Sequence, residues 1–134
     1  MRKCVYDLIV RGYELDSFGH VNNAVYLQYA EAALWNFFRI NKLMEYTLDR
    51  GIFPVVMESS QRYIHELKLL DEVRIESEFT ANGGMMICKH KIINICSHTQ
   101  FILYHKKSIL QTKNTRCSVN HGFDHIMYLL FYYY

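Results

Sequence analysis

The stretch Asp16-Ser17-Phe18-Gly19-His20-Val21-Asn22-Asn23, followed directly by residues 24–40, decides the fold of this chain. The quoted residues are dense in turn-forming types, and Gly19 can adopt a positive φ, so they predict a loop. Asn22 or Asn23 is the expected N-cap, because an Asn side chain accepts a hydrogen bond from the free amides of a first helical turn. Residues 24–40 lack Gly and Pro and predict one long helix.

The predicted helix is apolar around most of its circumference. Its polar residues Gln28, Glu31 and Arg39 form only a thin stripe. A helix with this pattern is normally buried. In a chain of 134 residues, a curved sheet is the obvious element to wrap around it.

Most of the remaining chain predicts antiparallel strands. Residues 73–80 alternate apolar and polar side chains, which indicates a half-buried strand. The following Ala81-Asn82-Gly83-Gly84 predicts a hairpin turn. One buried helix followed by an antiparallel meander is an α+β layout. Further strands are expected at 4–10, 53–63, 85–96, 101–110 and 116–119, with a short helix at 42–49 that ends at Gly51.

Length, charge and cysteine content narrow the class of protein. The length fits a single domain, 1–134, and the formal net charge of +2 argues against nucleic-acid binding. The four cysteines form no CxxC pair and lie at no zinc-finger spacing from His, so we expect reduced thiols in a cytoplasmic protein and no metal site. The apolar tail 126–134 is too short to span a bilayer, and the N-terminal residues show no sustained apolar run typical of a targeting segment.

The pattern Asp16-x-x-Gly19-His20-Val21-Asn22-Asn23-x-x-Tyr26-x-x-Tyr29-x-Glu31-x-Ala33 resembles the signature of hotdog-fold acyl-CoA thioesterases of the 4-hydroxybenzoyl-CoA thioesterase type. A second, weaker resemblance runs from Tyr63 to Glu76. Together they cover about residues 6–95; the resemblance is weak over 96–126, and the tail 127–134 is unassigned. The resemblance implies a hotdog fold, in which a curved antiparallel β-sheet wraps a long central helix.

The resemblance also implies an activity, the hydrolysis of an acyl-CoA thioester to a carboxylic acid and CoA without a cofactor. It implies that the Asn23 backbone amide polarises the thioester carbonyl and that the Asp16 carboxylate acts as nucleophile or as general base for water. Related plant acyl-carrier thioesterases use a His at a similar place, so His20 is a candidate orienting or substrate-contacting group. The spacing suits this chemistry, because a helix N-terminus supplies unpaired amides and the positive end of a dipole beside the carboxylate.

Further site residues are expected around this centre. Tyr26 is a packing residue with a hydroxyl to satisfy and a candidate substrate contact. Glu31 is a rival catalytic carboxylate, because some hotdog thioesterases place theirs on this helix. Ser59 and Ser60 fall on the strand that, in the family, faces the site from the opposite subunit, which implies a homodimer or homotetramer. Arg62 is a candidate contact for the CoA phosphates.

Simpler interpretations and other functions stay open. Asp16 taken alone is an ordinary turn residue before a helix, and His20 is more often a hydrogen-bonded structural residue than a catalyst. One alternative function is a hotdog hydratase or dehydratase, which needs a His and a carboxylate over the acyl carbons. Another is a non-catalytic protein that binds acyl thioesters.

Overall fold

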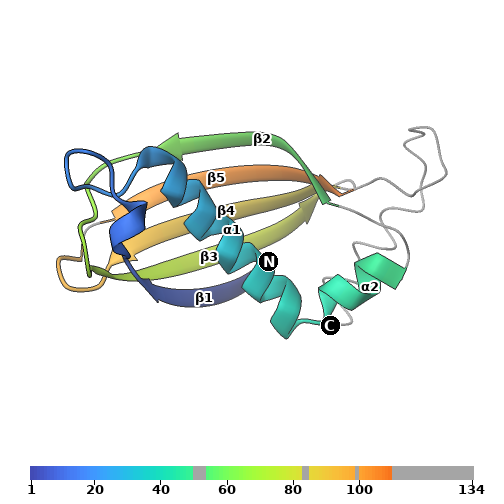
Figure 1. Ribbon diagram of the computed structural model, residues 1–134. Helices are drawn as coiled ribbons and strands as arrows, with labels where there is room; N and C mark the ends of the chain where they lie inside the picture. Colours follow the sequence, from blue (N-terminus) through green and yellow to red (C-terminus); the bar gives the residue numbers. More distant parts are fainter. Residues whose placement is uncertain (50–53, 83–84, 99, 110–134) are drawn as a thin grey trace.

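The computed structural model describes residues 1–49, 54–82, 85–98 and 100–109 (Figure 1). Within these ranges the strands form one five-stranded sheet in the order β1-β3-β4-β5-β2, and each neighbouring pair is antiparallel. The α+β class predicted from the sequence is confirmed. In chain order the elements are β1 (Arg2–Ile9), the 3-10 turn η1 (Gly12–Glu14), α1 (Asn23–Ile40), α2 (Leu43–Asp49), β2 (Pro54–Arg62), β3 (Glu72–Asn82), β4 (Met85–Asn94) and β5 (Gln100–Ile109).

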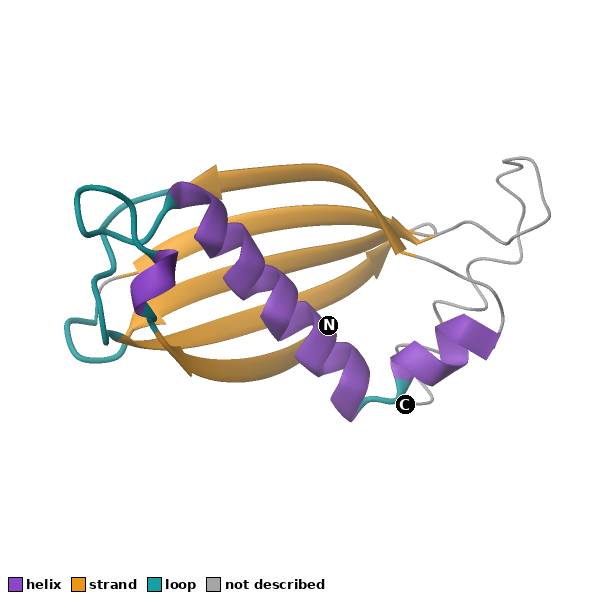
Figure 2. Ribbon diagram, viewed as in Figure 1, coloured by secondary structure: helices purple, strands orange, loops and turns teal. Residues whose placement is uncertain are grey.

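The sheet curves around α1, which lies across its inner face (Figure 2). Ala30 and Ala33 are buried on the helix face that meets the sheet, and their small side chains allow a close approach. Farther along α1, the ring of Phe37 stacks on Phe79 of β3 with centroids 3.9 Å apart. Fully burying a side chain of this size contributes roughly 1.5–3 kcal/mol. This packing fixes the direction of α1 and therefore the position of its N-terminus.

The alternation predicted for residues 73–80 is observed in β3. Val73, Ile75, Ser77 and Phe79 are buried, while the side chains between them point away from α1. Ser77 is the polar member of this set, and its Oγ lies 2.8 Å from Nδ1 of the buried His90 on β4. The hydrogen bond offsets the cost of burying both groups.

The outer face of α1 departs from the expectation of a helix buried all round. Trp35, on the side of the helix away from its buried residues, is 39% exposed. The strands that the structure describes form a single layer on one side of the helix, so the opposite side keeps its apolar residues in solvent. The expectation of burial is therefore wrong for this outer face, within the part of the chain that is described.

The other predicted elements differ from the observed ones only at their ends. The N-cap is Asn22 rather than Asn23, because the Asn22 side chain accepts a hydrogen bond from the Ala24 amide at 3.0 Å. The expected helix stop at Gly51, the turn residues Gly83 and Gly84, the strand predicted at 116–119 and the tail 127–134 lie outside the described residues.

Candidate active site

The loop before α1 is closed by hydrogen bonds of Asp16. Its Oδ1 accepts from the backbone amides of Phe18 at 2.8 Å and His20 at 3.2 Å. Gly19 takes a φ of 80°, a conformation that favours glycine, and its amide donates to the Asp16 carbonyl at 3.1 Å. Among the described residues nothing bonds to Oδ2 of Asp16, so this carboxylate holds its loop with one oxygen and presents the other.

Two backbone hydrogen bonds fasten the end of this loop to neighbouring segments. The Val21 amide donates to the Leu67 carbonyl at 2.9 Å, and the Asn22 amide donates to the Glu14 carbonyl at 2.9 Å. Asp16 and the first turn of α1 are therefore held in one fixed relation, as the short loop between them predicts.

The first turn of α1 leaves one amide open. Asn22 accepts from Ala24 with its side chain and from Val25 with its carbonyl, at 3.0 and 2.9 Å. The Asn23 N–H has no acceptor in the portion of the chain that the structure describes, and Asn23 is exposed. An unpaired amide at the positive end of a helix dipole is suited to bind an oxygen that becomes negative.

Two tyrosines connect this turn to the segment after β2. The buried Tyr26 accepts a hydrogen bond on its hydroxyl from the Leu67 amide at 3.1 Å, and burial raises the pKa of its phenol to about 12. The Tyr63 hydroxyl donates to the Asn23 carbonyl at 2.9 Å, and burial raises the pKa of Tyr63 as well. Tyr26 is thus a packing residue whose hydroxyl has a hydrogen-bond partner, as predicted. Its contact with substrate stays a prediction.

The side chain of His20 turns toward a charged group that sequence reasoning missed. Its Nε2 lies 3.8 Å from Oε1 of Glu66. The same Oε1 forms an ion pair with Nζ of Lys68 at 3.0 Å. The hydrogen bond and charge of Lys68, and then the charge of His20, hold the pKa of Glu66 below its usual range. His20 and Lys68 also form an antiparallel bridge, so the 66–68 segment flanks the Asp16 loop.

The remaining predicted residues lie on α1 and β2. Glu31 is half-buried on α1, and Ser59, Ser60 and Arg62 are exposed on β2. Among the strands that the structure describes, β2 lies at one edge of the sheet and pairs with β5. The role of each of these four residues at the site stays a prediction.

A second carboxylate, Glu14, is buried near the loop. Its Oε2 accepts from the Arg11 amide and from the Tyr29 hydroxyl, both at 2.7 Å, and its Oε1 accepts from Arg11 Nε at 3.0 Å and Nη2 at 2.6 Å. Burial raises the pKa of Glu14, but the hydrogen bonds and charge of Arg11 and the bond from Tyr29 outweigh it and place the pKa below its usual range. The Arg11-x-x-Glu14 spacing is the sequence signal that could have found this cluster.

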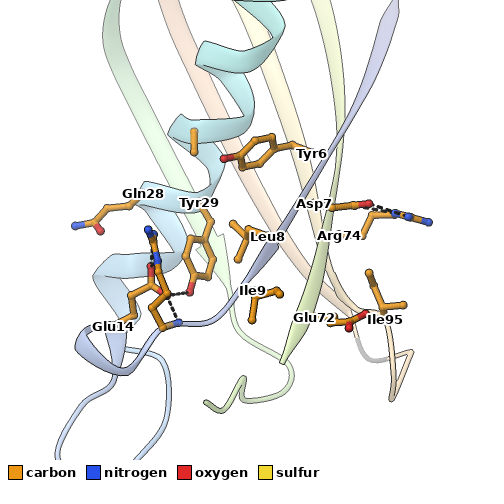
Figure 3. Close-up of a pocket in the computed structure, with 12 residues that line it drawn as sticks. Tyr6, Asp7, Leu8, Ile9, Glu14, Gln28, Tyr29, Glu72, Arg74 and Ile95 are labelled. Carbon is orange, nitrogen blue, oxygen red and sulfur yellow. Dashed lines mark hydrogen bonds and ion pairs between the residues drawn. The ribbon is translucent and has the colours of Figure 1, made fainter. Parts of the chain in front are cut away.

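The cluster borders a cleft of about 840 Å³ on the β1 side of α1. Figure 3 shows Tyr6, Leu8 and Tyr29 between β1 and α1, with the Asp7–Arg74 ion pair on the other side of β1. Asp16 and Asn23 are not among the residues that line it. This cleft is therefore separate from the open carboxylate and amide. Its lining is Tyr6, Asp7, Leu8, Ile9, Arg11, Glu14, Gln28, Tyr29, Ala32, Glu72, Arg74 and Ile95.

Two further features bear on function. In the described ranges no three or more His, Cys, Asp or Glu side chains are grouped so that they could hold a metal ion. Among the described helices, none combines the length and the apolar character needed to cross a membrane.

A curved antiparallel sheet around one long helix, with an Asp loop at the helix start, defines a protein of the hotdog class. Within that class the chain belongs to the thioesterase-like superfamily, whose family model matches residues 10–123. The hotdog thioesterase family that the motif predicts is thereby confirmed, while the narrower 4-hydroxybenzoyl-CoA type stays a prediction.

Individual relatives agree with this assignment. The long-chain acyl-CoA thioesterase FadM of Escherichia coli (strain K12) is 33% identical over 75 residues, which are 56% of this chain and 57% of FadM. The crystal structure of YbaW from Escherichia coli, a probable thioesterase, matches with a TM-score of 0.77 and 25% identity over 85% of this chain and 87% of that one. Slr0204 from Synechocystis, a 1,4-dihydroxy-2-naphthoyl-CoA thioesterase, shares the fold with a TM-score of 0.75 at 14% identity, over 87% and 90% of the two chains.

Proposed function

We propose that this protein is an acyl-CoA thioesterase that hydrolyses an acyl-CoA thioester to a carboxylic acid and CoA. One observation carries the proposal. The open Oδ2 of Asp16 and the open amide of Asn23 belong to the same hydrogen-bonded loop at the positive end of α1. The family and the similarity to a long-chain acyl-CoA thioesterase support the substrate class.

The amide of Asn23 is the proposed oxyanion donor. It donates a hydrogen bond to the thioester carbonyl oxygen, and as an oxygen nucleophile adds to the carbonyl carbon, negative charge develops on that oxygen. The amide and the helix dipole stabilise this charge, and one such donor lowers the barrier by roughly 3 kcal/mol in other acyl-transfer enzymes. The C–S bond then breaks, and its electron pair leaves with the CoA sulfur, which takes up a proton.

Asp16 has two routes in this proposal. As a nucleophile, its carboxylate adds to the carbonyl carbon and forms an acyl anhydride that water hydrolyses. As a general base, it takes a proton from the attacking water. In both routes the oxygen bound by Phe18 and His20 holds the loop while the open oxygen reacts.

The exposed residues of β2 are proposed to complete the site from a second copy of the chain. Among the described strands β2 lies at an edge of the sheet, where its outer backbone groups offer a surface for strand pairing. A homodimer or homotetramer formed there would place Ser59 and Ser60 beside the thioester and Arg62 near the CoA phosphates. Glu31 and Tyr26, from α1, are proposed to line the acyl side.

The test is a panel of short, long and aromatic acyl-CoA esters, assayed for release of free thiol with the wild type and with Asp16→Asn. Hydrolysis by the wild type and its loss in the variant support the proposal. Wild-type turnover that Asp16→Asn leaves unchanged would remove Asp16 from the mechanism. Tight binding of the esters without turnover would instead support a non-catalytic binding protein.

The geometry disfavours the alternative of a hydratase or dehydratase. That chemistry needs His20 and a carboxylate over the same acyl carbons. His20 Nε2 lies toward Glu66 at 3.8 Å, and no hydrogen bond joins the ring to Asp16 in the described part of the chain. Incubating the protein with an enoyl-CoA and following the loss of the conjugated double bond tests this alternative directly.

A further inference from the structure

We propose that Tyr63 is a positioning residue for the Asn23 amide and acts through the carbonyl of the same residue. The inference rests on the proposed thioesterase mechanism, in which that amide binds the thioester oxygen. Tyr63 directly follows the last residue of β2. It is not part of the sequence motif that runs from Asp16 to Ala33.

The contact that carries the inference joins two distant parts of the chain. The Tyr63 hydroxyl lies 2.9 Å from the Asn23 carbonyl oxygen across 40 residues of sequence. The carbonyl and the amide of Asn23 are linked through one Cα, so a bond that holds the carbonyl restricts the two backbone dihedrals that aim the amide. Helix ends otherwise fray, and the amide that must meet a developing oxyanion sits in the first turn.

Tyr63 is itself held by the frame that fastens the Asp16 loop. Its ring meets the ring of Tyr26 edge to face, with centroids 5.3 Å apart. The Tyr26 hydroxyl accepts the Leu67 amide at 3.1 Å, and the Leu67 carbonyl accepts the Val21 amide at 2.9 Å. One connected set of contacts therefore places both Asn23 and the end of the loop.

Gln61 determines where the single proton of the Tyr63 hydroxyl goes. The Tyr63 hydroxyl faces two acceptors, the Oε1 of Gln61 and the carbonyl oxygen of Asn23. A hydroxyl donates one hydrogen bond, so all three groups are satisfied only when the Gln61 amide is turned over, its NH₂ donates to Tyr63 and Tyr63 donates to Asn23. A carboxylate at position 61 accepts only and would draw the proton away from Asn23.

A substrate contact is the rival role for Tyr63, because its side chain is 44% exposed. The two roles differ in kinetics. A group that binds substrate equally in the ground and transition states changes KM, whereas a group that aims the oxyanion donor changes kcat.

The experiment measures kcat, KM and the melting temperature for Tyr63→Phe, Gln61→Glu, the double variant and two reference variants. Tyr63→Phe keeps the ring against Tyr26 and removes only the hydroxyl. We expect kcat to fall about three- to ten-fold with KM changed by less than about two-fold. Gln61→Glu should lower kcat similarly, and the double variant should be no slower than Tyr63→Phe alone.

The reference variants separate the failures. Tyr6→Phe removes a hydroxyl that has no hydrogen bond among the described residues and should keep the wild-type kcat. If Asp16→Asn hydrolyses the ester as fast as the wild type, the proposed function itself fails. If Asp16→Asn is inactive while Tyr63→Phe keeps the wild-type kcat, or changes only KM or only the melting temperature, the positioning role of Tyr63 alone is overturned.

Discussion

Two carboxylates stand two positions apart in the chain, and their surroundings are opposite. Glu14 is 3% exposed, and both of its oxygens accept hydrogen bonds, from Arg11 and from the Tyr29 hydroxyl. Asp16 is half-buried, and of its two carboxylate oxygens only Oδ1 has a hydrogen-bond partner among the described residues, namely two amides of its own loop.

The difference separates a structural role from a chemical one. For Glu14 to attack or to take a proton, it would have to give up charge-assisted hydrogen bonds in a buried place, which is costly. Asp16 can use its open oxygen without breaking the loop. The cleft described above borders Glu14, so a cleft is a poorer guide to the reacting carboxylate here than an oxygen without a hydrogen-bond partner among the described residues.

The largest expected effect is the loss of activity in Asp16→Asn. The amide oxygen can still accept the loop amides, but the side chain is neither a nucleophile of equal strength nor a base. We expect hydrolysis to fall by about 10²- to 10⁴-fold, with the melting temperature near that of the wild type. Thiol release and a thermal melt on the same preparation check this. A large loss of stability in Asp16→Asn would mean that Asp16 resembles Glu14 and is structural.

Glu14→Gln should give the reverse pattern. The neutral amide loses the charge that pairs with Arg11, and its NH₂ group faces donors, so a buried donor is left unsatisfied. We expect the free energy of unfolding to fall by about 2–3 kcal/mol, measured by urea denaturation, while kcat per folded molecule stays within about three-fold of the wild type. A loss of kcat as large as that of Asp16→Asn, at full stability, would contradict the division between the two carboxylates.

The stability that Glu14 contributes should depend on pH. The pKa of Glu14 is lower when folded than its ordinary value of 4.5, so its ionised form stabilises the fold fully above about that pH. This stabilisation is lost as the pH falls through the folded pKa. We expect the stability gap between wild type and Glu14→Gln to narrow on acidification from pH 6 to pH 3, as measured by urea denaturation at each pH. A gap that stays constant would show that Glu14 is not ionised in the fold.

Sequence reasoning located the groups that are neighbours along the chain and missed those that meet only in the fold. Asp16 and Asn23 share one short loop, so their proximity follows from spacing. Tyr63 reaches Asn23 only because β2 returns across the sheet, and its contact spans 40 residues. Glu66 is likewise placed beside His20 by an antiparallel bridge that no local pattern predicts.

The same distinction between local patterns and contacts made only in the fold explains which helices and strands were predicted well. The period-2 pattern of 73–80 and the Gly-free run 24–40 are local, and both predict β3 and α1 closely. How far α1 is covered depends on how many layers pack on it, which its own composition does not encode. The exposed Trp35 shows that an apolar circumference overestimates burial when the described sheet lies on one side.

The smallest expected effect belongs to Tyr29→Phe. This variant removes one of the donors to Glu14 Oε2 and leaves the other, the Arg11 amide, in place. A hydrogen bond to a charged acceptor contributes about 1.5 kcal/mol at the lower end of its range, so the loss of stability should be near that value and below the loss in Glu14→Gln. Tyr6→Phe is the matched control, because the Tyr6 hydroxyl has no bonded partner among the described residues, and this variant should unfold as the wild type does.

Tyr29 and Glu14 belong to one hydrogen-bond network, so Tyr29→Phe should cost less stability in the Glu14→Gln background than alone. If the two losses of stability measured by urea denaturation were strictly additive, the hydrogen bond of the Tyr29 hydroxyl would not depend on the charge of Glu14. The description of Glu14 as a carboxylate held by its hydrogen-bond network would then be wrong.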